Sequence, residues 1–529
     1  MTASLLKTSG LVPLMFFGVG VLTVLAATPH GIGFQHDSVF YWSAADGLLE
    51  GRGISRIDGS GVPIPITHFP PLYPTALALG AWVSRASVTE VARGLAGALL
   101  GMNLVLVWLL ARRATGSALA AGLTGGLVYL SPFVLERHLW AMSEPLHFAL
   151  LLAATGLLMV HLREPNHWAV VAAALVAGLA YLNRYVGLSL ILSSLIGLLL
   201  LGRGSARRRI QEAAMFAGIS LLPGILWQIR NLQLTGFAAN RVLGWHPLTF
   251  AKLKEAGATL ASWAPVEQFS LEVRAILVGL VALLVAWIGL RFVRGHYAEP
   301  AGTDARSLLA LTGIHALSYV ALLAISISIF DASTRLDPRA LSPIFLLGIL
   351  TACVIGWKLT MSRGGRLVRV AAAGIAGLIG IAYGIRSAAL LQNSVANGLG
   401  FSSDSWRTSE TIRLVARLDP QLLIYSNEAL PVYFLSGHPA YSVPEMLDPV
   451  KDSLRADFPA LFDDMRRELA TGEAVLVLFH PESLGSALPE LKLLTERLEA
   501  VGVADDGIIY RSTELTGHAR QRPGFGIAG

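Results

Sequence analysis

The sequence predicts a polytopic α-helical membrane protein that carries a separate α/β domain at its C-terminal end. Of its 529 residues, 54% are hydrophobic and only 14% are charged, and the mean hydropathy is +0.59. This composition excludes a soluble globular enzyme. The formal net charge of +6 is small for this length and does not indicate a nucleic-acid partner. The single cysteine, Cys353, excludes an intramolecular disulfide and a metal site built from cysteines.

Roughly eleven stretches are apolar and long enough to cross a bilayer, which takes about 20 residues. They are 10–27, 90–111, 117–134, 141–161, 168–183, 185–202, 211–229, 272–290, 307–330, 341–361 and 367–388. We interpret the first as an uncleaved anchor rather than a signal peptide, although the small residues at its end would suit cleavage. The apolar stretch 71–83 is shorter and follows a proline pair, which favours a helix lying at the membrane interface.

The basic residues predict the orientation of these spans. With a cytoplasmic N-terminus, every strong basic cluster also falls on the cytoplasmic side, as the positive-inside rule requires. The clusters are Arg112–Arg113, Arg163, the run 203–209, Arg291 with Arg294, and Arg363 with Arg366 and Arg369. Counting 71–83 as a span would invert this arrangement. We therefore expect a multi-pass protein of a bacterial inner (plasma) membrane, with its C-terminal domain outside the cytoplasm.

The hydropathy pattern divides the chain into two parts. The transmembrane domain is expected at 1–390, with a first extracytoplasmic loop at 28–89, and the C-terminal domain at 391–529. Strand-like stretches in that domain alternate with helix-like ones, which is typical of an α/β fold. The strands are expected at 422–425, 474–479 and 507–510, the helices at 459–470 and 488–500, and a disordered tail at 517–529. No internal repeat is evident, so the inverted repeats of many secondary transporters are not indicated.

Ionisable residues gather at the outer ends of the spans, whereas the span interiors are nearly free of charge. Asp37 lies just past the first span, and Glu144 lies at the lip of a later one. A carboxylate at a membrane lip is costly unless it is solvated or paired, so both are functional candidates. Asp37 and Tyr41 are four residues apart and would share one face of a helix. Asp37 either accepts a proton from an acceptor hydroxyl or caps that helix.

Three outer arginines are candidates for binding an anion. Arg184 lies at an abrupt turn between two spans, on the side where arginine is disfavoured. It either binds an anionic partner, for which phosphate is the natural choice, or extends to the interface. Arg230, followed by Asn231, lies at the end of another span. It is either a second phosphate contact or a helix cap. Asp337 and Arg339 open a later span. They either bind phosphate or sugar, or form an internal ion pair that holds the loop. For Asp337 the structural role is favoured.

Two histidines raise the question of a metal. His68 and His246 are metal-ligating residue types, but a pair so far apart in the sequence is weak support. No cofactor is therefore expected, and a divalent metal is not favoured. Glu136, Arg137 and His138 are expected to form a solvated cluster at the interface rather than a site.

The order of these motifs resembles the C-type integral-membrane glycosyltransferases, which have the GT-C fold. Within them it is similar to the protein O-mannosyltransferase superfamily, which includes the lipid A aminoarabinose transferases. The motifs are Asp37 with Tyr41, the run from His68 to Pro74, Ser143-Glu144-Pro145, Leu182-Asn183-Arg184-Tyr185, Trp227 with Arg230-Asn231, and Asp337-Pro338-Arg339 with Pro343. The resemblance covers about residues 10–390. Where the aminoarabinose transferases carry an acid–lysine pair, this chain has His68 and Phe69, which removes a cation from that position.

The resemblance implies an enzyme that transfers a hexose or pentose from a polyprenyl-phosphate-linked donor on the extracytoplasmic face, with inversion at the anomeric centre. The acceptor would be a lipid, glycan or protein, and membrane lipids would be further partners. The implied roles are catalysis for Asp37 and Glu144, donor-phosphate binding for Arg184, Arg230 and Arg339, and substrate binding for Tyr41, His68, Tyr73, Asn231 and Asp337.

Two other functions compete with this one. A C-type polysaccharide ligase or polymerase would use a polyprenyl-diphosphate glycan, and the outer arginines would suit a diphosphate equally well. A lipid-linked glycan transporter would bind and move its substrate without chemistry. The near absence of charge inside the spans argues against the transporter.

Overall fold

The structure is a computed structural model that describes residues 3–239, 243–294, 303–362, 366–448, 453–483, 495 and 498–512. By their contacts the residues form two compact units. Unit 1 comprises Met1–Ile32 and Thr67–Gly398, and unit 2 comprises Gly33–Ile66 and Leu399–Gly529. The expected tail at 517–529 lies outside the described residues.

Part of the first loop expected at 28–89, residues 33–66, packs with the C-terminal domain. The N–H of Phe401 donates to the carbonyl oxygen of Phe34 over 2.9 Å. The ring of Phe34 also stacks on Phe434, with 4.5 Å between the ring centroids. Unit 2 is therefore assembled from two segments that lie more than 300 residues apart in the sequence, separated by residues 67–398 of unit 1.

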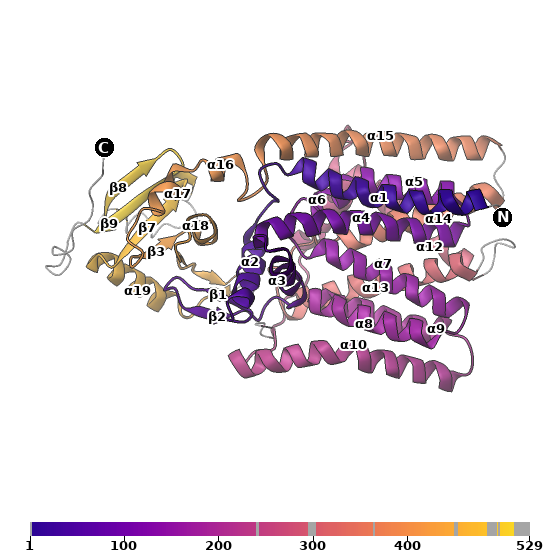
Figure 1. The fold of residues 1–529 in the computed structure, drawn as a ribbon, viewed down its shortest axis with the longest axis horizontal. Coiled ribbons are helices and arrows are strands. Elements are labelled where there is room, and N and C mark those ends of the chain that lie inside the picture. Colours follow the sequence, from indigo (N-terminus) through magenta and orange to yellow (C-terminus); the bar gives the residue numbers. More distant parts are fainter. Residues whose placement is uncertain are drawn as a thin grey trace. The chain divides into compact units, whose positions relative to one another are not determined.

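The named elements of unit 1 in its described residues are all helices, and the long ones run side by side (Figure 1). Its helices are α1 (Ala3–Ala27), α3 (Leu72–Ser84), α4 (Val88–Thr115), α5 (Ala118–Leu130), α6 (Pro132–Arg137), α7 (Glu144–Arg163), α8 (His167–Asn183), η1 (Tyr185–Gly187), α9 (Leu188–Leu201), α10 (Ala206–Thr235), α11 (Phe250–Trp263), α12 (Leu271–Val293), α13 (Thr303–Ile329), α14 (Ser342–Ser362) and α15 (Arg366–Asn397).

The predicted spans all fall on helices, although 117–134 is divided between α5 and α6, and 185–202 between η1 and α9. Among the described residues, 8 helices are long and apolar enough to cross a membrane. Three further apolar helices, Ala118–Leu130, His167–Asn183 and Tyr185–Leu201, are shorter. The prediction of a polytopic integral membrane protein is thus confirmed. The interfacial stretch expected at 71–83 is helix α3.

Local sequence signals explain where the helices begin and end. Helix α4 begins with a capping box, in which Ser87 accepts from the N–H of Glu90 while the Glu90 carboxylate accepts from the N–H of Ser87. It ends at Gly116, whose φ of 74° suits a residue without Cβ. Helices α1 and α4 approach closely where a Cβ on Gly101 would lie 2.5 Å from the carbonyl oxygen of Phe17. Small residues at such a crossing let two membrane helices pack backbone to backbone.

Unit 2 contains a five-stranded sheet in the order β4-β3-β7-β9-β8. The pairs β3–β4 and β3–β7 are parallel, whereas β9 runs antiparallel to both β7 and β8. Its elements are α2 (His36–Leu49), β1 (Ser55–Ile57), β2 (Pro63–Pro65), α16 (Asp404–Arg407), α17 (Glu410–Val415), β3 (Leu423–Ser426), α18 (Ala429–Ser436), β4 (Tyr441–Ser442), β5 (Leu447–Asp448), β6 (Ser453–Leu454), α19 (Phe458–Thr471), β7 (Ala474–Phe479), η2 (Pro481–Ser483), β8 (Leu498–Ala504) and β9 (Gly507–Ser512).

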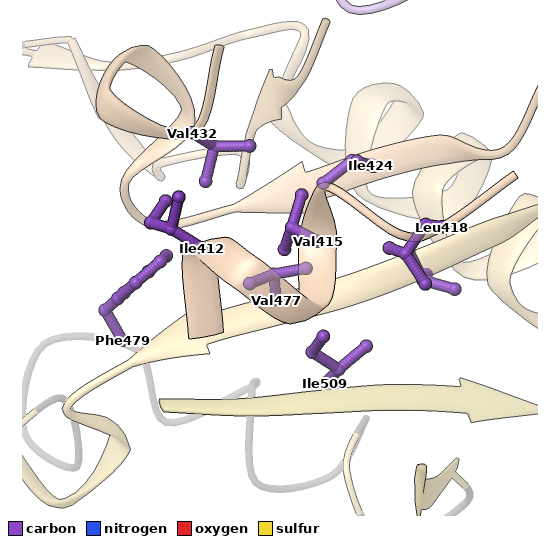
Figure 2. Packing of buried hydrophobic residues seen from close by; sticks show 9 residues of the cluster. Ile412, Val415, Leu418, Ile424, Val432, Val477, Phe479 and Ile509 are labelled. Carbon is purple, nitrogen blue, oxygen red and sulfur yellow. The ribbon is translucent and has the colours of Figure 1, made fainter. Parts of the chain in front are cut away.

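Strand β7 is the centre of the core of unit 2, and all six of its residues are buried. Its side chains alternate between the two faces of the sheet. Val475, Val477 and Phe479 join the cluster of α17 and α18, which is drawn in Figure 2. Leu476 and Leu478, with Ala474, join the opposite cluster, to which α19 contributes Met465 and Leu469. A strand covered on both faces is a continuous apolar run, which is why the sequence identified it.

The α/β prediction for this region is confirmed, with one correction. The expected strands correspond to β3, β7 and β9, and the expected helix 459–470 corresponds to α19. The expected helix 488–500 is wrong at its end, because residues 498–500 belong to β8, which pairs with β9. The rest of that stretch lies outside the described residues, apart from Thr495. Pairing with a neighbouring strand decides the conformation of a short segment that has no strong helical signal of its own.

Candidate active site

In unit 1, three residues from distant parts of the sequence meet in one ionic cluster. Glu144 opens α7, Arg184 directly follows α8, and Arg339 precedes α14. The Oε1 atom of Glu144 lies 2.6 Å from Nη1 of Arg184 and also accepts a hydrogen bond from Nε of Arg339. Arg339 and Glu144 are 195 residues apart in the sequence. The structure thus brings one predicted catalytic residue together with two of the three predicted phosphate ligands.

The local backbone fixes the geometry of this cluster. Helix α8 stops at Asn183, and Arg184 adopts an extended conformation with φ of −151°. The side-chain amide of Asn183, which is fully buried, donates to the carbonyl oxygen of Ser143 over 2.8 Å. Nη1 of Arg184 also donates to the hydroxyl of Ser143 over 3.1 Å. The end of α8 is therefore tied to the start of α7, and this places Arg184 beside Glu144.

In this cluster two guanidinium groups share the one carboxylate of Glu144. Glu144 is 2% exposed, whereas the side chains of Arg184 and Arg339 are 21% and 25% exposed. The buried carboxylate thus contacts both arginines, and both arginine side chains remain partly exposed to solvent. A phosphate is the anion that two guanidinium groups bind best, because each offers a planar fork of donors.

The sequence interpretation missed His147, which lies on the same helix as Glu144. His147 is one helical turn beyond Glu144 and is 1% exposed. Neither of its ring nitrogens has a hydrogen-bond partner among the described residues. The spacing of three residues from Glu144 on a helix was the only available signal, since it places both side chains on one face.

Arg230 belongs to a second cluster, in which Asn231 and Tyr185 hold the chain at Thr67. The amide of Asn231, fully buried, donates to the carbonyl oxygen of Thr67 over 3.2 Å, and the hydroxyl of Tyr185 donates to the same oxygen over 2.9 Å. Nη1 of Arg230 donates to Oδ1 of Asn231 over 3.0 Å, and its guanidinium lies 4.6 Å from the ring centroid of Trp227. Asn231 is therefore a buried organising residue.

Other candidates from unit 1 have structural contacts. Oδ1 of Asp337 accepts from the N–H of Ala340 over 2.8 Å, within the turn before α14. Tyr73 is 1% exposed within α3. The ring of His68 packs against Phe69 with 4.3 Å between the centroids. In the part of the chain that the structure describes, no group of three or more His, Cys, Asp or Glu residues could hold a metal ion.

The expected solvated cluster at 136–138 is wrong for its histidine. His138 is fully buried, Nε2 lies 3.0 Å from the amide nitrogen of Asn103, and Nδ1 lies 2.8 Å from the carbonyl oxygen of Val134. Burial lowers the pKa of His138 to about 4, so it is neutral at physiological pH. Glu136 and Arg137 form an ion pair with a distance of 2.6 Å. A short helix, α6, turns the histidine inward, and sequence neighbours alone could not show this.

In unit 2, Asp37 lies in the first turn of α2. The N-cap of this helix is Gln35, so Asp37 does not occupy the capping position itself. A carboxylate in the first turn is stabilised by the positive end of the helix dipole. Asp37 is half-buried, whereas Tyr41, one turn further along the same helix, is 3% exposed.

A second group that the sequence interpretation missed lies near the start of α2. Nε2 of His36 is 3.9 Å from Oε2 of Glu428, the residue that precedes α18. Burial raises the pKa of Glu428, against the opposing effect of His36 and His480. Glu428 and His480 follow the neighbouring parallel strands β3 and β7. The carboxyl ends of parallel strands are the usual place for functional side chains in α/β sheets, but the parallel pairing was not visible in the sequence.

Comparison with known proteins identifies the fold. No protein-family model matches the sequence, and no curated protein matches it. Among solved structures, ArnT from Cupriavidus metallidurans bound to undecaprenyl phosphate is similar, with a TM-score of 0.57 and 15% identity over 94% of this chain and 97% of that chain. The archaeal oligosaccharyltransferase AglB from Archaeoglobus fulgidus, in complex with an inhibitory peptide and a dolichol-phosphate, has a TM-score of 0.56 at 11% identity, over 95% of this chain and 74% of that one.

The arabinofuranosyltransferase AftD from Mycobacteria has a TM-score of 0.52 at 14% identity, and the match covers 94% of this chain but only 40% of AftD. At these identities the similarity concerns the fold. All three neighbours are membrane glycosyltransferases of the C type. The chain therefore has the GT-C fold, as its resemblance to this group predicted.

Proposed function

We propose that this protein is a glycosyltransferase that takes a sugar from a polyprenyl-phosphate donor and transfers it to a lipid, glycan or protein acceptor on the extracytoplasmic face of the membrane. The observation that carries the proposal is the pair of arginines, Arg184 and Arg339, that share the single buried carboxylate of Glu144. The structural similarity to ArnT, which binds undecaprenyl phosphate, supports the same class of donor.

The arginines would stabilise the leaving group. Breaking the bond between the sugar and the lipid phosphate releases a phosphate whose charge has to be stabilised rather than protonated. Two guanidinium groups at a partly buried site do this without reorganisation at the moment of reaction. Arg230, stacked on Trp227, is a further candidate contact for the donor.

Glu144 is better suited to positioning than to proton transfer. Its Oε1 already accepts from both arginines, and the residue is almost completely shielded from solvent. In place of the expected catalytic role, we assign it the role of holding Arg184 and Arg339 at a fixed separation. The role of general base then falls to Asp37, which is half-buried in the first turn of α2 and would accept the proton of the acceptor hydroxyl as the new bond forms.

The decisive experiment is the substitution Asp37→Asn in the full-length protein. It keeps the shape of the side chain but removes the proton acceptor, and loss of a general base typically lowers the rate about 10²–10⁴-fold. Transfer would be measured with a panel of polyprenyl-phosphate sugars, and donor-site binding with undecaprenyl phosphate. We expect transfer to be lost while binding is retained. The matched control is Asp46→Asn, on the same helix, whose carboxylate lies 3.5 Å from Arg52.

Two outcomes would contradict the proposal. Near-normal turnover of Asp37→Asn would show that Asp37 is not the base. Much tighter binding of undecaprenyl diphosphate than of undecaprenyl phosphate would favour the polysaccharide ligase or polymerase instead.

The proposed orientation has its own test. If the basic run 203–209 faces the cytoplasm, a Ser205→Cys variant in a Cys353→Ala background should resist an impermeant thiol reagent in intact cells and react after lysis. Residue 205 precedes α10, outside the apolar part of that helix. Labelling from outside would invert the topology and place the C-terminal domain in the cytoplasm.

A further inference from the structure

At the opposite end of α7 from Glu144, unit 1 contains a cavity of about 330 Å³. Arg203, Arg306 and Ser307 line it, together with the apolar side chains of Leu162, Leu201 and Val293. The lining residues come from the end of α7, the end of α9 and the turn after it, the last residue of α12 and the first turns of α13. Four helices that are separate in the sequence therefore build this cavity.

The arginines around this end of unit 1 fall into two groups. Asp304, at the start of α13, pairs with Arg113 over 3.1 Å and with Arg163 over 3.0 Å. Arg203 and Arg306, in contrast, have no carboxylate within ion-pairing distance in the described parts of the chain. The two arginines that line the cavity are thus not paired with a carboxylate of the described residues.

The lining suits the phosphate of a lipid rather than a free anion. Two guanidinium groups bind a phosphate with charge-assisted hydrogen bonds, and Ser307 offers a hydroxyl beside Arg306. The apolar walls add nothing to the binding of an inorganic ion, but they suit the glycerol and the first methylene groups of a phospholipid. Basic pockets between membrane helices on the cytoplasmic side bind anionic head groups in this way.

We propose that this cavity is a binding site for the head group of an anionic phospholipid, separate from the donor site and independent of the glycosyltransferase function. The lipid would join the ends of α7, α9, α12 and α13 by supplying the negative charge that the two arginines lack. A consequence is that the stability of unit 1 depends on the lipid composition of the membrane.

The test uses the full-length protein, purified in detergent and stripped of lipid. Binding of phosphatidylglycerol and of phosphatidylcholine would be compared by native mass spectrometry and by the increase in Tm. We expect phosphatidylglycerol to bind more tightly, and the double variant Arg203→Gln/Arg306→Gln to weaken that binding roughly ten-fold or more, because charge-assisted hydrogen bonds are lost. The control is Arg207→Gln, which removes one charge from an exposed arginine that does not line the cavity and is compared with the single variants Arg203→Gln and Arg306→Gln.

A second variant guards against misfolding. Arg203→Lys/Arg306→Lys keeps both charges and should retain part of the preference for phosphatidylglycerol. Equal binding of phosphatidylglycerol to wild type and to the double glutamine variant would overturn the proposal. So would an equal loss in Arg207→Gln, which would indicate a general effect of charge. Complete displacement of the lipid by inorganic phosphate at a similar concentration would show that the site takes a free anion.

Discussion

The substitution Glu144→Gln tests how the arginine pair is held. Glutamine has nearly the same shape but no charge, so Arg184 and Arg339 would be left facing each other without their shared carboxylate. Removing one partner from a buried ion pair destabilises a protein by about 3–5 kcal/mol, because the remaining charge is uncompensated. The two arginines are 21% and 25% exposed, and water can therefore resolvate them in part. We accordingly expect a loss near the lower end, about 3 kcal/mol.

A double-mutant cycle isolates the interaction. Arg339→Gln alone leaves the ion pair of Glu144 and Arg184. In the double variant Glu144→Gln/Arg339→Gln, the carboxylate is lost, but one of the two cations that it held is lost with it. The double variant should therefore be less destabilised than the sum of the single variants, with a coupling of about 0.5–3 kcal/mol. The measurement is the unfolding of the detergent-purified proteins.

Undecaprenyl phosphate provides a second assay of the same variants. If the arginines form the phosphate site, this ligand replaces the missing carboxylate and should raise the Tm of Glu144→Gln more than that of wild type. Transfer should still be severely impaired, because the arginines are no longer held at the right separation. A Glu144→Gln variant with wild-type stability, no coupling to Arg339 and no transfer would refute this reasoning and would return Glu144 to a direct role in the chemistry.

Two further predictions concern single residues. Arg184→Ala should weaken the binding of undecaprenyl phosphate about ten- to a hundred-fold, since charge-assisted hydrogen bonds contribute roughly 1.5–3 kcal/mol. Arg184→Lys should restore only part of this affinity. Equal affinity in wild type and both variants would move the phosphate site to Arg230 or Arg339. In unit 2, burial acts to raise the pKa of Asp506, but hydrogen bonds, including those from Thr411, outweigh it and lower the pKa below its ordinary value of 3.8. A carboxylate with a lowered pKa stabilises the fold above its unfolded pKa and loses that contribution as the pH falls through its folded pKa. The protection factors of the α17 amides, which correct for the intrinsic exchange rate, should therefore fall in acid, and in Asp506→Asn they should already be low at neutral pH. An Asp506→Asn protein with wild-type protection would contradict this.

The spans and the central strand β7 were predictable from the sequence, because burial in an apolar environment leaves a local signature. A membrane helix needs a long apolar run, and a strand covered on both faces needs a short one. The side chains of Glu144 and Arg184 were likewise identifiable as candidates, since a charge at the end of an apolar span requires a reason.

The tertiary structure decided which of these residues meet. The sharing of Glu144 by Arg184 and Arg339 depends on how three helix ends pack, and no local pattern encodes a contact across 195 residues. The same holds for the packing of residues 33–66 with the C-terminal domain, which rests on contacts such as that between Phe34 and Phe434. His138 was misjudged because its neighbours in sequence are charged, whereas its neighbours in space are Asn103 and the backbone of Val134.

The physical reason is the range of the interactions involved. Hydropathy and helix capping act within a few residues and can be recognised one segment at a time. Ion pairing and the burial of a polar group depend on distances between segments that only the folded chain sets. The sequence by itself determined that this protein is a membrane protein with candidate polar groups at the ends of its spans, and the fold determined that two of its arginines share one carboxylate.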